Sequence, residues 1–330
     1  MKLIFDLGNG YGKLVTPSGL SVSPSWVAPI TDRTQAGNAR VIEYVSGLSP
    51  HLSRGAMFAG GSDAATFLPQ TSQRVGDYSD STGKSKLGLQ LLASSLPSQS
   101  LVIDELVISC PDLDIHTPNL RAAFLGSHEF RTAGQSYRLD IENVKVVNEG
   151  LGVAAYGLYT GQVKDSSGYI VVVDIGYQTA IMSAYTANGD EITSLRYSSQ
   201  HGASTLYQAV ANDSVLRQML GRAPKISLIE QAFRDPARRY GKGSEAPQID
   251  TICRRHHDQW LTNLFTPMYE RLKDASDETS SIVLAGGGSN LALPLLSISK
   301  KFAQLDRPQD ANALGLAIIA GVQSPQAIAA

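Results

Sequence analysis

Short runs of apolar residues, each ended by glycine or polar residues, recur along this chain and predict many short strands. Strands are expected at residues 3–5, 20–27, 101–109, 144–147, 169–174, 180–185 and 281–284. The run at 169–174 is almost wholly apolar, which is typical of a strand buried on both faces. Helices are expected at about 150–159, 249–273 and from about 310 onward. Strands and helices mixed in this way indicate an α/β fold.

One local pattern occurs twice: a strand, an Asp-x-Gly turn and a second strand. A chain of 330 residues exceeds the size at which a single core usually stops growing. The polar stretch at 164–168 separates the two copies of the pattern. We therefore predict two lobes, residues 1–163 and 164–330. The least regular segment, residues 70–86, is expected as an exposed loop that leads into a helix.

Composition narrows the class of protein. With 42% hydrophobic and 18% charged residues and a formal net charge of -2, the chain has no overall attraction to nucleic acid or anionic lipid. The early charge at Asp6 argues against a signal peptide, and no run approaches the roughly 18 apolar residues of a membrane span. Cys110 and Cys253 are too few for a disulfide framework or a zinc site. A cytoplasmic protein is expected.

The first candidate for chemistry is the turn from Asp6 to Lys13. Its three alternating glycines, Gly8, Gly10 and Gly12, allow a ligand to approach the backbone, and exposed amides in such a turn bind anionic oxygens. Lys13 adds a cation that could reach a phosphate, and Asp6 is placed to hold a hydrated Mg²⁺. Glycine turns between strands are common, so this motif alone does not identify a ligand.

The second candidate follows the most apolar strand, where Asp174 again precedes a glycine turn and a threonine hydroxyl. Two such loops from two related halves could face each other across a cleft and share a metal-bound polyphosphate. The pair is far more specific than either loop. The residues of this turn are Asp174, Ile175, Gly176, Tyr177, Gln178 and Thr179.

A third candidate is Glu149, where a predicted strand passes into a helix. Its carboxylate could orient or activate a water that attacks a terminal phosphate. The alternative is that Glu149 only favours the start of the helix, as acidic residues do.

Glycines mark two further positions. Gly286, Gly287 and Gly288 follow a predicted strand and suit a flat ligand such as a purine, with Ser289 as a plausible first helical residue. Gly202, at the start of another predicted helix, is expected to make a smaller contribution.

Three other patterns do not indicate a site. The tripeptide at 83–85 lacks the earlier glycine of a P-loop, because Tyr78 stands in its place. The turn at 8–12 leads into a second strand, whereas a dinucleotide-binding turn opens a helix. The basic clusters at 234–242 and 254–257 are typical of solvated faces or of a contact with a neighbouring subunit.

In their order along the chain, these motifs resemble the superfamily of actin, Hsp70 and sugar kinases. The segment 141–150 and the strand ending in Cys110-Pro111 are similar to the ParM/StbA plasmid-segregation ATPases. The resemblance implies an actin-like ATPase fold, with two ribonuclease-H-like lobes that hold ATP or GTP and Mg²⁺ between them. The segment 311–315 resembles a closing helix, expected at about 310–330, that packs back toward the first lobe.

The resemblance also implies a role for each motif. Asp6 and Asp174 would hold the metal through water, and Glu149 would position the hydrolytic water. The phosphates would be gripped by Gly8, Asn9, Gly10, Tyr11, Lys13, Gly176, Tyr177, Gln178 and Thr179. The adenosine would lie against Gly286, Gly287, Gly288 and Ser289. Relatives often carry smaller residues in place of Tyr177 and Gln178, and bulk there could slow hydrolysis.

The predicted function is an ATPase that polymerises head to tail on binding ATP and disassembles after hydrolysis. The family implies a DNA-binding adaptor protein as partner, plasmid DNA as cargo, and no direct contact with nucleic acid or membrane. Two alternatives stay open. One is a small-molecule kinase of the same superfamily, which Glu149 disfavours because a kinase needs an aspartate near the acceptor hydroxyl. The other is a nucleotide-binding scaffold with little turnover, which the bulky Tyr177 and Gln178 favour.

Overall fold

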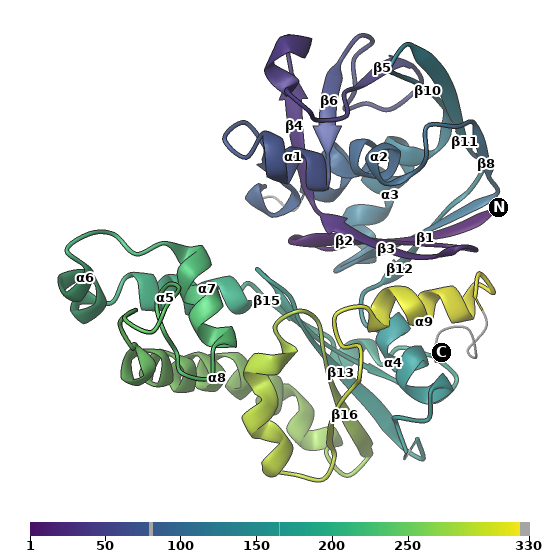
Figure 1. Ribbon diagram of the computed structural model, residues 1–330. Coiled ribbons are helices and arrows are strands. Elements are labelled where there is room, and N and C mark those ends of the chain that lie inside the picture. The colour runs from purple at the N-terminus through teal and green to yellow at the C-terminus, as the bar shows by residue number, and fades with distance from the viewer. Residues whose placement is uncertain (79–81, 165, 324–330) are drawn as a thin grey trace.

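The computed structural model describes residues 1–78, 82–164 and 166–323. The chain forms two lobes, one above the other in Figure 1, and each lobe is built on a five-stranded sheet. Within the described ranges, no helix is both long and apolar enough to cross a membrane.

The first lobe contains the sheet that begins the chain. Strands β1 (Lys2–Leu7), β2 (Tyr11–Thr16) and β3 (Gly19–Pro24) pair antiparallel. Strands β9 (Glu105–Cys110) and β12 (Val144–Asn148) extend this sheet parallel to β1, in the order β12-β9-β1-β2-β3.

The sheet of the second lobe repeats this arrangement. Strands β13 (Tyr169–Ile175), β14 (Ala180–Tyr185) and β15 (Tyr197–Ser199) pair antiparallel. Strands β16 (Thr279–Ala285) and β17 (Phe302–Gln304) continue the sheet parallel to β13. The pattern that the sequence contains twice is therefore a true structural repeat of strand, turn and strand.

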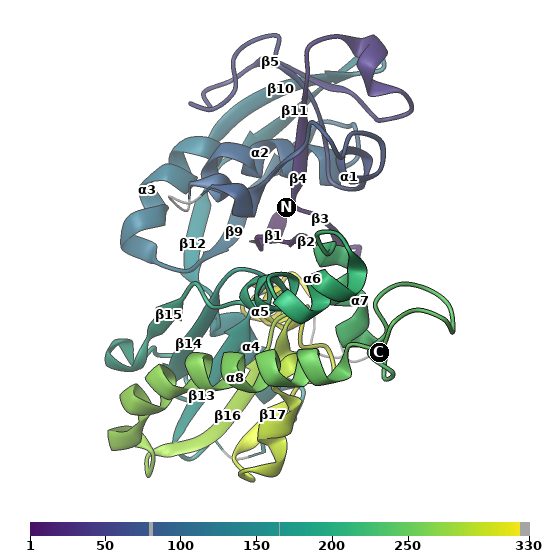
Figure 2. The same cartoon turned by 90° about the vertical axis from the view of Figure 1, so that its left-hand side faces the viewer.

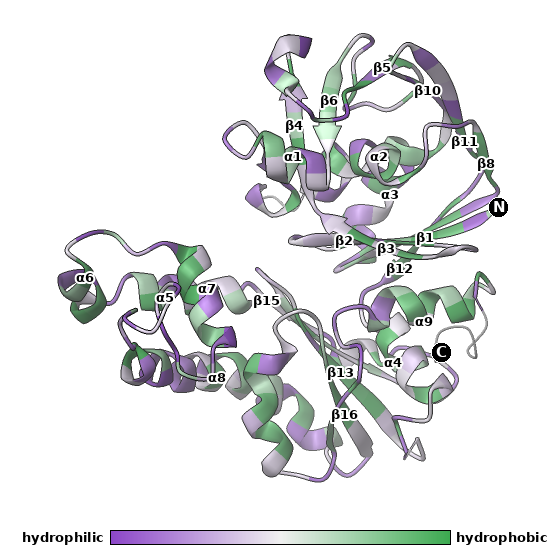
Figure 3. Cartoon of the chain, viewed as in Figure 1, coloured by the Kyte–Doolittle hydropathy of each residue, from purple (hydrophilic) through white to green (hydrophobic). Residues whose placement is uncertain are grey.

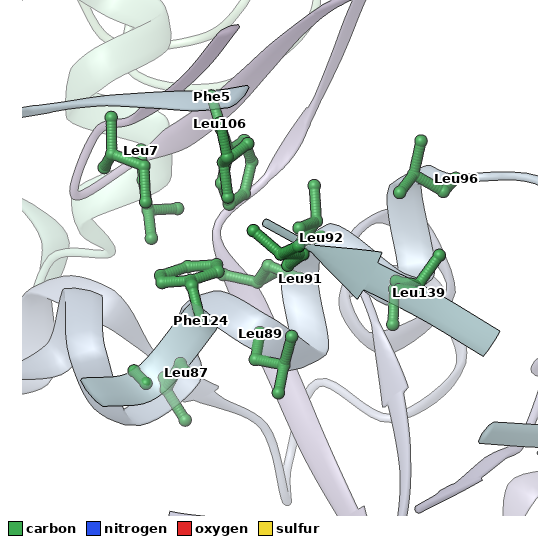
Figure 4. Close-up of a cluster of buried hydrophobic side chains, with 14 of the residues drawn as sticks. Phe5, Leu7, Leu87, Leu89, Leu91, Leu92, Leu96, Leu106, Phe124 and Leu139 are labelled. Atoms are coloured by element: carbon green, nitrogen blue, oxygen red, sulfur yellow. The ribbon is translucent and has the colours of Figure 1, made fainter. Parts of the chain in front are cut away.

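One face of the first sheet is covered by α2 (Gly83–Ser95) and α3 (Leu113–Phe124). Figure 4 shows leucines of α2 packed among side chains of the sheet and of α3. Phe5 and Phe124 meet edge to face, with ring centroids 6.3 Å apart. Such aromatic pairs add stability beyond the area that they bury, so β1 has a rigid base behind the turn that follows it.

Helices also cover both faces of the second sheet. On one face lie α5 (Ala203–Ala211), α7 (Ile226–Arg234) and α8 (Asp250–Leu272), with α6 (Ser214–Leu220) beside them; Figure 2 shows α8 crossing in front of the strands. The opposite face packs against α4 (Leu151–Tyr159).

The lobes meet at a crossing of two helices, α4 and α9 (Ala311–Ile319). Helix α9, largely coloured as hydrophobic in Figure 3, packs on β1 and β2 of the first sheet, while α4 packs on β13 and β16. Gly152 and Gly315 meet where the helices cross, and a side chain at either would overlap the backbone of the other helix. The crossing is therefore as close as two backbones allow.

A third sheet, of seven strands, lies on the outer side of the first lobe, and the sequence analysis did not predict it. The run predicted as one strand at 20–27 is two strands in different sheets, because β3 ends at Pro24 and β4 begins at Trp26. The run at 101–109 is divided in the same way at Asp104. The strands of this sheet are β4 (Trp26–Ile30), β5 (Ile42–Ser46), β6 (Met57–Gly60), β7 (Gln73–Arg74), β8 (Leu101–Ile103), β10 (Gly126–Thr132) and β11 (Gln135–Ile141), with α1 (Ser62–Phe67) nearby.

The segment 70–86, expected as an exposed loop that leads into a helix, is largely exposed at 70–74 and enters α2 at Gly83, but part of it is more ordered than predicted. It contains β7, a 3-10 turn at Val75–Asp77 and the first turn of α2, in which Lys84 and Ser85 are buried. Residues 79–81 lie outside the described part of the chain. The burial of Val75, Lys84 and Ser85 was not predicted, because it comes from residues distant in sequence, which a local polar pattern does not reveal.

Candidate functional site

A cavity of about 750 Å³ lies between the two lobes, and residues of both line it. It brings together nearly all of the residues that the sequence singled out. These are Asp6, Gly8, Asn9, Gly10, Tyr11, Lys13, Glu149, Asp174, Gly176, Tyr177, Gln178, Thr179, Gly286, Gly287 and Gly288. Gly202 and Ser289 are the exceptions, since neither lines the cavity.

The first turn joins β1 to β2 and is held from both sides. The amide of Gly8 donates to the carbonyl of Tyr11 at 3.1 Å, and Ser25 Oγ donates to the carbonyl of Gly8 at 2.6 Å. A Cβ at residue 8 would lie only 2.9 Å from the Tyr11 carbonyl oxygen, so the tight turn requires glycine. The break after β3 that places Ser25 here thus helps to shape the turn.

The carboxylate of Asp6 is almost fully buried and well partnered. It accepts hydrogen bonds from Lys13 Nζ at 3.0 Å, Ser109 Oγ at 2.6 Å and Asn312 Nδ2 at 3.1 Å. Burial alone would raise the pKa of Asp6, but the charge of Lys13 and the hydrogen bond from Ser109 outweigh it, so the pKa lies below its usual value. Asp6 is therefore charged at neutral pH.

The second turn, between β13 and β14, has the same backbone bond: Gly176 donates to the carbonyl of Thr179 at 2.8 Å. Its carbonyls accept from the first amides of α5, with Ala203 to Gly176 at 3.0 Å and Ser204 to Tyr177 at 2.7 Å. The N-terminus of α5 thus supports the turn. Gly202 belongs to this support, because its amide donates to the carbonyl of Gln178 and a side chain there would overlap the turn.

The carboxylate of Asp174 differs from that of Asp6. Among the described residues, no side chain or amide forms a hydrogen bond or an ion pair with it. Burial, followed by the charge of Glu149, raises the pKa of Asp174 to about 7, against the opposing effect of Lys13. Asp174 lies at a carboxylate-rich point of the cavity where a cation would be stabilised.

Glu149 stands between β12 and α4, facing the cavity from the first sheet. Its amide donates to the carbonyl of Cys110 at 2.9 Å. The next residue, Gly150, has φ 101°, which favours glycine, and its amide donates to Asn312 Oδ1 at 3.2 Å. Asn312, at the start of α9, therefore joins the Glu149 turn to Asp6.

Lys84, which was not predicted for the site, lines the cavity from the first turn of α2. Its Nζ forms an ion pair with Glu149 Oε1 and also donates to the carbonyl of Ser109 at 3.3 Å. The segment 83–85 is the first turn of a helix and not a P-loop, but its lysine still reaches the site. No local pattern marks it, because its partner is 65 residues away.

The segment at 75–78 was also missed, although it lines the cavity. Gln178 Nε2, from the second turn, donates to the carbonyl of Gly76, so the lobes touch directly here. Tyr177 packs at the edge of the core of the second lobe. The large side chain of Gln178 thus contacts the other lobe, and that of Tyr177 packs against the core of the second lobe.

One end of the cavity is formed by the second lobe. The three glycines of 286–288 lie beside the second turn, since the amide of Gly288 donates to the carbonyl of Ile175 at 2.8 Å. Ser289 is buried beneath them and bonds Gln304. This end of the cavity is also lined by residues that were not predicted for a site: Tyr207, Glu230, Phe233, Arg234, Arg238 and His257.

The basic residues in this set add to one interpretation, because Arg234 is solvated as expected, with its side chain 73% exposed, and also borders the cavity. Arg234 and Arg238, from the cluster expected at a solvated face or a subunit contact, line the cavity. Of the second cluster, Arg255 and His256 bond the carboxylate of Asp213, the first residue before α6, so that these charges hold helices together.

Chemically, the cavity combines an anion-binding floor with a carboxylate pair. Two glycine turns and two lysines suit a polyphosphate, and Asp6 and Asp174 suit a hard cation, which prefers oxygen ligands. Both oxygens of Asp6 already accept protein hydrogen bonds, so Asp6 would reach such a cation through water. An end lined by glycines, aromatic rings and arginines suits a planar base.

Comparisons with known proteins agree with this architecture. Residues 172–297 match the family described as archaeal actin homologue MreB-like, C-terminal. No curated protein matches the sequence. The match to this family covers much of the second lobe.

Several solved structures share the fold over nearly the whole chain. The archaeal actin homolog Ta0583 is 18% identical with a TM-score of 0.79, covering 97% of this chain and 100% of its own. Its complex with ADP gives a TM-score of 0.75 at the same identity and coverage. A 15-stranded ParM filament from Clostridium botulinum is 14% identical, covers 95% of this chain and 97% of its own, and gives a TM-score of 0.71. The predicted actin-like fold of two lobes, and with it the resemblance to ParM-like actin homologues at the level of fold, is confirmed.

Proposed function

We propose that this actin-like chain binds Mg-ATP between its lobes, hydrolyses it, and assembles head to tail into filaments that segregate plasmid DNA in the cytoplasm. The observation that carries the proposal is the pair of related turns, each with one aspartate, on opposite walls of one cavity. The complex of the archaeal actin homolog with ADP supports the choice of an adenine nucleotide. GTP remains the other candidate.

Asp6 and Asp174 would hold Mg²⁺ through water, and the ion would neutralise phosphate charge as the terminal phosphate is transferred. The glycine turns at 8–10 and 176–178 would bind the phosphates by their amides, and Lys13 by its charge. Gly286 to Gly288 would lie against the adenosine. Gly202 and Ser289 would act indirectly, since they support the loops on which these groups lie.

Glu149 would orient the water that attacks the terminal phosphorus. In this step the water oxygen bonds to phosphorus, the bond from phosphorus to the bridging oxygen breaks, and ADP leaves. The water proton passes to Glu149 or to the phosphate released.

Filament formation is proposed from the fold, because surfaces for polymerisation have no local motif. A head-to-tail contact produces an open filament when its rotation does not close. The similarity to a ParM filament supports this contact. A DNA-binding adaptor would join the filament to its plasmid, since the chain itself has a net charge of only -2.

The test is light scattering at 90° with parallel phosphate release after adding Mg-ATP or Mg-GTP. Scattering by the wild type should rise and then decay, whereas Glu149→Ala should scatter persistently and release phosphate about 10²-fold more slowly. Glu142→Ala, an exposed glutamate before β12, is the matched control and should behave like the wild type.

Other outcomes separate the alternatives. Phosphate release without scattering would leave an ATPase and remove the filament. ATP binding without phosphate release would favour the scaffold. Consumption of ATP only after a metabolite is added would favour the kinase.

A further inference from the structure

Two effects disfavour the positive charge of the buried Lys84 side chain. Its side chain is only 7% exposed, and burial disfavours the charged form of a lysine. It also lies in the first turn of a 13-residue helix, where the helix dipole disfavours positive charge. A lysine here needs a specific partner that outweighs both effects.

That partner is Glu149, with Ser109 as a second acceptor. Burial would lower the pKa of Lys84, but the charge and hydrogen bond of Glu149 raise it above its ordinary value, so the ammonium stays charged. The pair is anchored on both sides. Ser109 belongs to β9, which is paired on both sides by β12 and β1, and Gly83 packs so closely on the carbonyl of Val75 that a side chain there would overlap it.

The pair also uses the two oxygens of Glu149 differently. Oε1 is engaged by Lys84, while Oε2 has no hydrogen-bond partner within residues 1–78, 82–164 and 166–323. A carboxylate held through one oxygen keeps the other in a defined place, where it can accept a hydrogen bond from a water in the cavity.

The charges that line the cavity also indicate that Glu149 needs Lys84 as a partner. Asp6, Glu149 and Asp174 carry three negative charges when ionised, and Lys13 is bonded to Asp6. Without Lys84, Glu149 would be an uncompensated carboxylate facing the place proposed for a polyphosphate. It would then be repelled from the position that hydrolysis requires.

We propose that Lys84 is a positioning residue: it orients the carboxylate of Glu149 for the attacking water and neutralises it toward the nucleotide. This inference rests on the proposed hydrolytic function. A shift of a reacting group by about 1 Å can cost 10²-fold in rate, so the ion pair matters for turnover although Lys84 need not touch the phosphate.

The experiment is a double-mutant cycle with Lys84→Met, Glu149→Gln and the double variant. Turnover of Lys84→Met should fall about 10²-fold, and the double variant should be no slower than Glu149→Gln alone. Lys84→Arg, which keeps the charge, should recover part of the loss. Lys86→Met, two residues along the same helix and outside the cavity lining, is the matched control.

A second readout needs no turnover: the affinity for a fluorescent, non-hydrolysable ATP analogue with Mg²⁺. Lys84→Met should bind it on the order of tenfold more weakly, because Glu149 is then uncompensated. The double variant should return to the wild-type affinity, because both members of the pair are then neutral. This recovery also shows that the variants fold.

Clear results would overturn the proposal. Wild-type turnover in Lys84→Met would do so, as would independent losses in the double variant with no recovery of affinity, which would place Lys84 directly on the phosphate. If the wild type releases no phosphate, the proposed function fails and this inference with it. If the wild type is active, Glu149→Gln inactive and Lys84→Met active, only the inference fails.

Discussion

The two Asp-x-Gly turns have the same backbone and opposite electrostatics. In each, the glycine amide donates to the carbonyl three residues on, at 3.1 Å in the first turn and 2.8 Å in the second. Yet Asp6 accepts bonds from Lys13, Ser109 and Asn312, whereas Asp174 faces the charge of Glu149. The two turns share a backbone shape, but the partners that stabilise a negative charge surround the aspartate of the first turn.

This difference indicates a division of work. The first turn is neutralised by its own lobe, so it can hold its shape without a ligand. The pKa of Asp174 is raised to about 7, which means that its ionised form is disfavoured until a cation approaches. When a metal-nucleotide binds, the charge of the second turn should therefore change more than that of the first.

Exchanging each aspartate for asparagine should give the largest effect. Asp6→Asn leaves Lys13, only 13% exposed, without its ion-pair partner, and should lower the free energy of unfolding by about 3 kcal/mol. Asp174→Asn relieves repulsion and should raise the stability of the nucleotide-free protein. Both should lower turnover by about 10²-fold or more. Urea denaturation and phosphate release measure this, with exposed Asp190→Asn as control.

The comparison breaks if the two variants change stability in the same direction. That result would mean that Asp174 has a stabilising partner comparable to Lys13.

The pH dependence of the nucleotide-free protein should come next in size. Since the pKa of Asp174 is raised from 3.8 to about 7, the folded state binds a proton that the unfolded state does not between these values. Stability should therefore fall as pH rises from 5 to 8, by about 2–3 kcal/mol from this group. Asp174→Asn should lack this part of the slope, measured by urea denaturation at each pH. An unchanged slope would contradict the raised pKa.

A substitution at Asn312 tests the difference between the two turns through a partner of Asp6. Asn312→Ala removes the donor to Asp6 and the acceptor of the Gly150 amide, so one buried carboxylate and one buried amide lose a partner. We expect a loss of about 1–3 kcal/mol in stability and a weaker apparent affinity for Mg²⁺. Asn290→Ala, which lies at the base end of the cavity, should leave the Mg²⁺ dependence unchanged. Equal Mg²⁺ curves for Asn312→Ala and wild type would contradict this.

The smallest effect should come from Gln178→Gly, which gives the second turn the glycine that the first has at Gly10. It removes the bond to the Gly76 carbonyl between the lobes. One neutral hydrogen bond is worth about 0.5–1.5 kcal/mol, so nucleotide dissociation should speed up by roughly twofold to twelvefold. Stopped-flow release of a fluorescent nucleotide measures this. Slower release would show that Gln178 instead crowds the cavity.

Local patterns predicted the parts of the site that follow a strand directly. The turns after Asp6 and Asp174, the Glu149 junction and the glycines at 286–288 all combine a β run with a glycine or a carboxylate at its end. Their assembly in one cavity follows from the repeat, because both sheets direct equivalent strand ends to the same side.

The parts that were missed depend on contacts distant in sequence. Lys84 matters only because Glu149 lies opposite it, and the segment 75–78 only because Gln178 reaches Gly76. The outer sheet was missed for a related reason: the runs at 20–27 and 101–109 change sheets at Ser25 and Asp104, and the polar residues there do not reveal that the next strand pairs in another sheet. Pairing partners, which decide the sheet, are invisible in a local pattern.

The crossing of α9 over the first sheet affects how the protein is made. The face of that sheet directed toward the second lobe, with Ile4 and Val15, packs against Ala313, Leu316 and Ala317. A ribosome adding roughly 5–20 residues per second needs some 15–60 seconds to pass from β1 to α9. During that time this apolar face has no permanent cover, so the nascent first lobe is a natural client for a chaperone until α9 emerges.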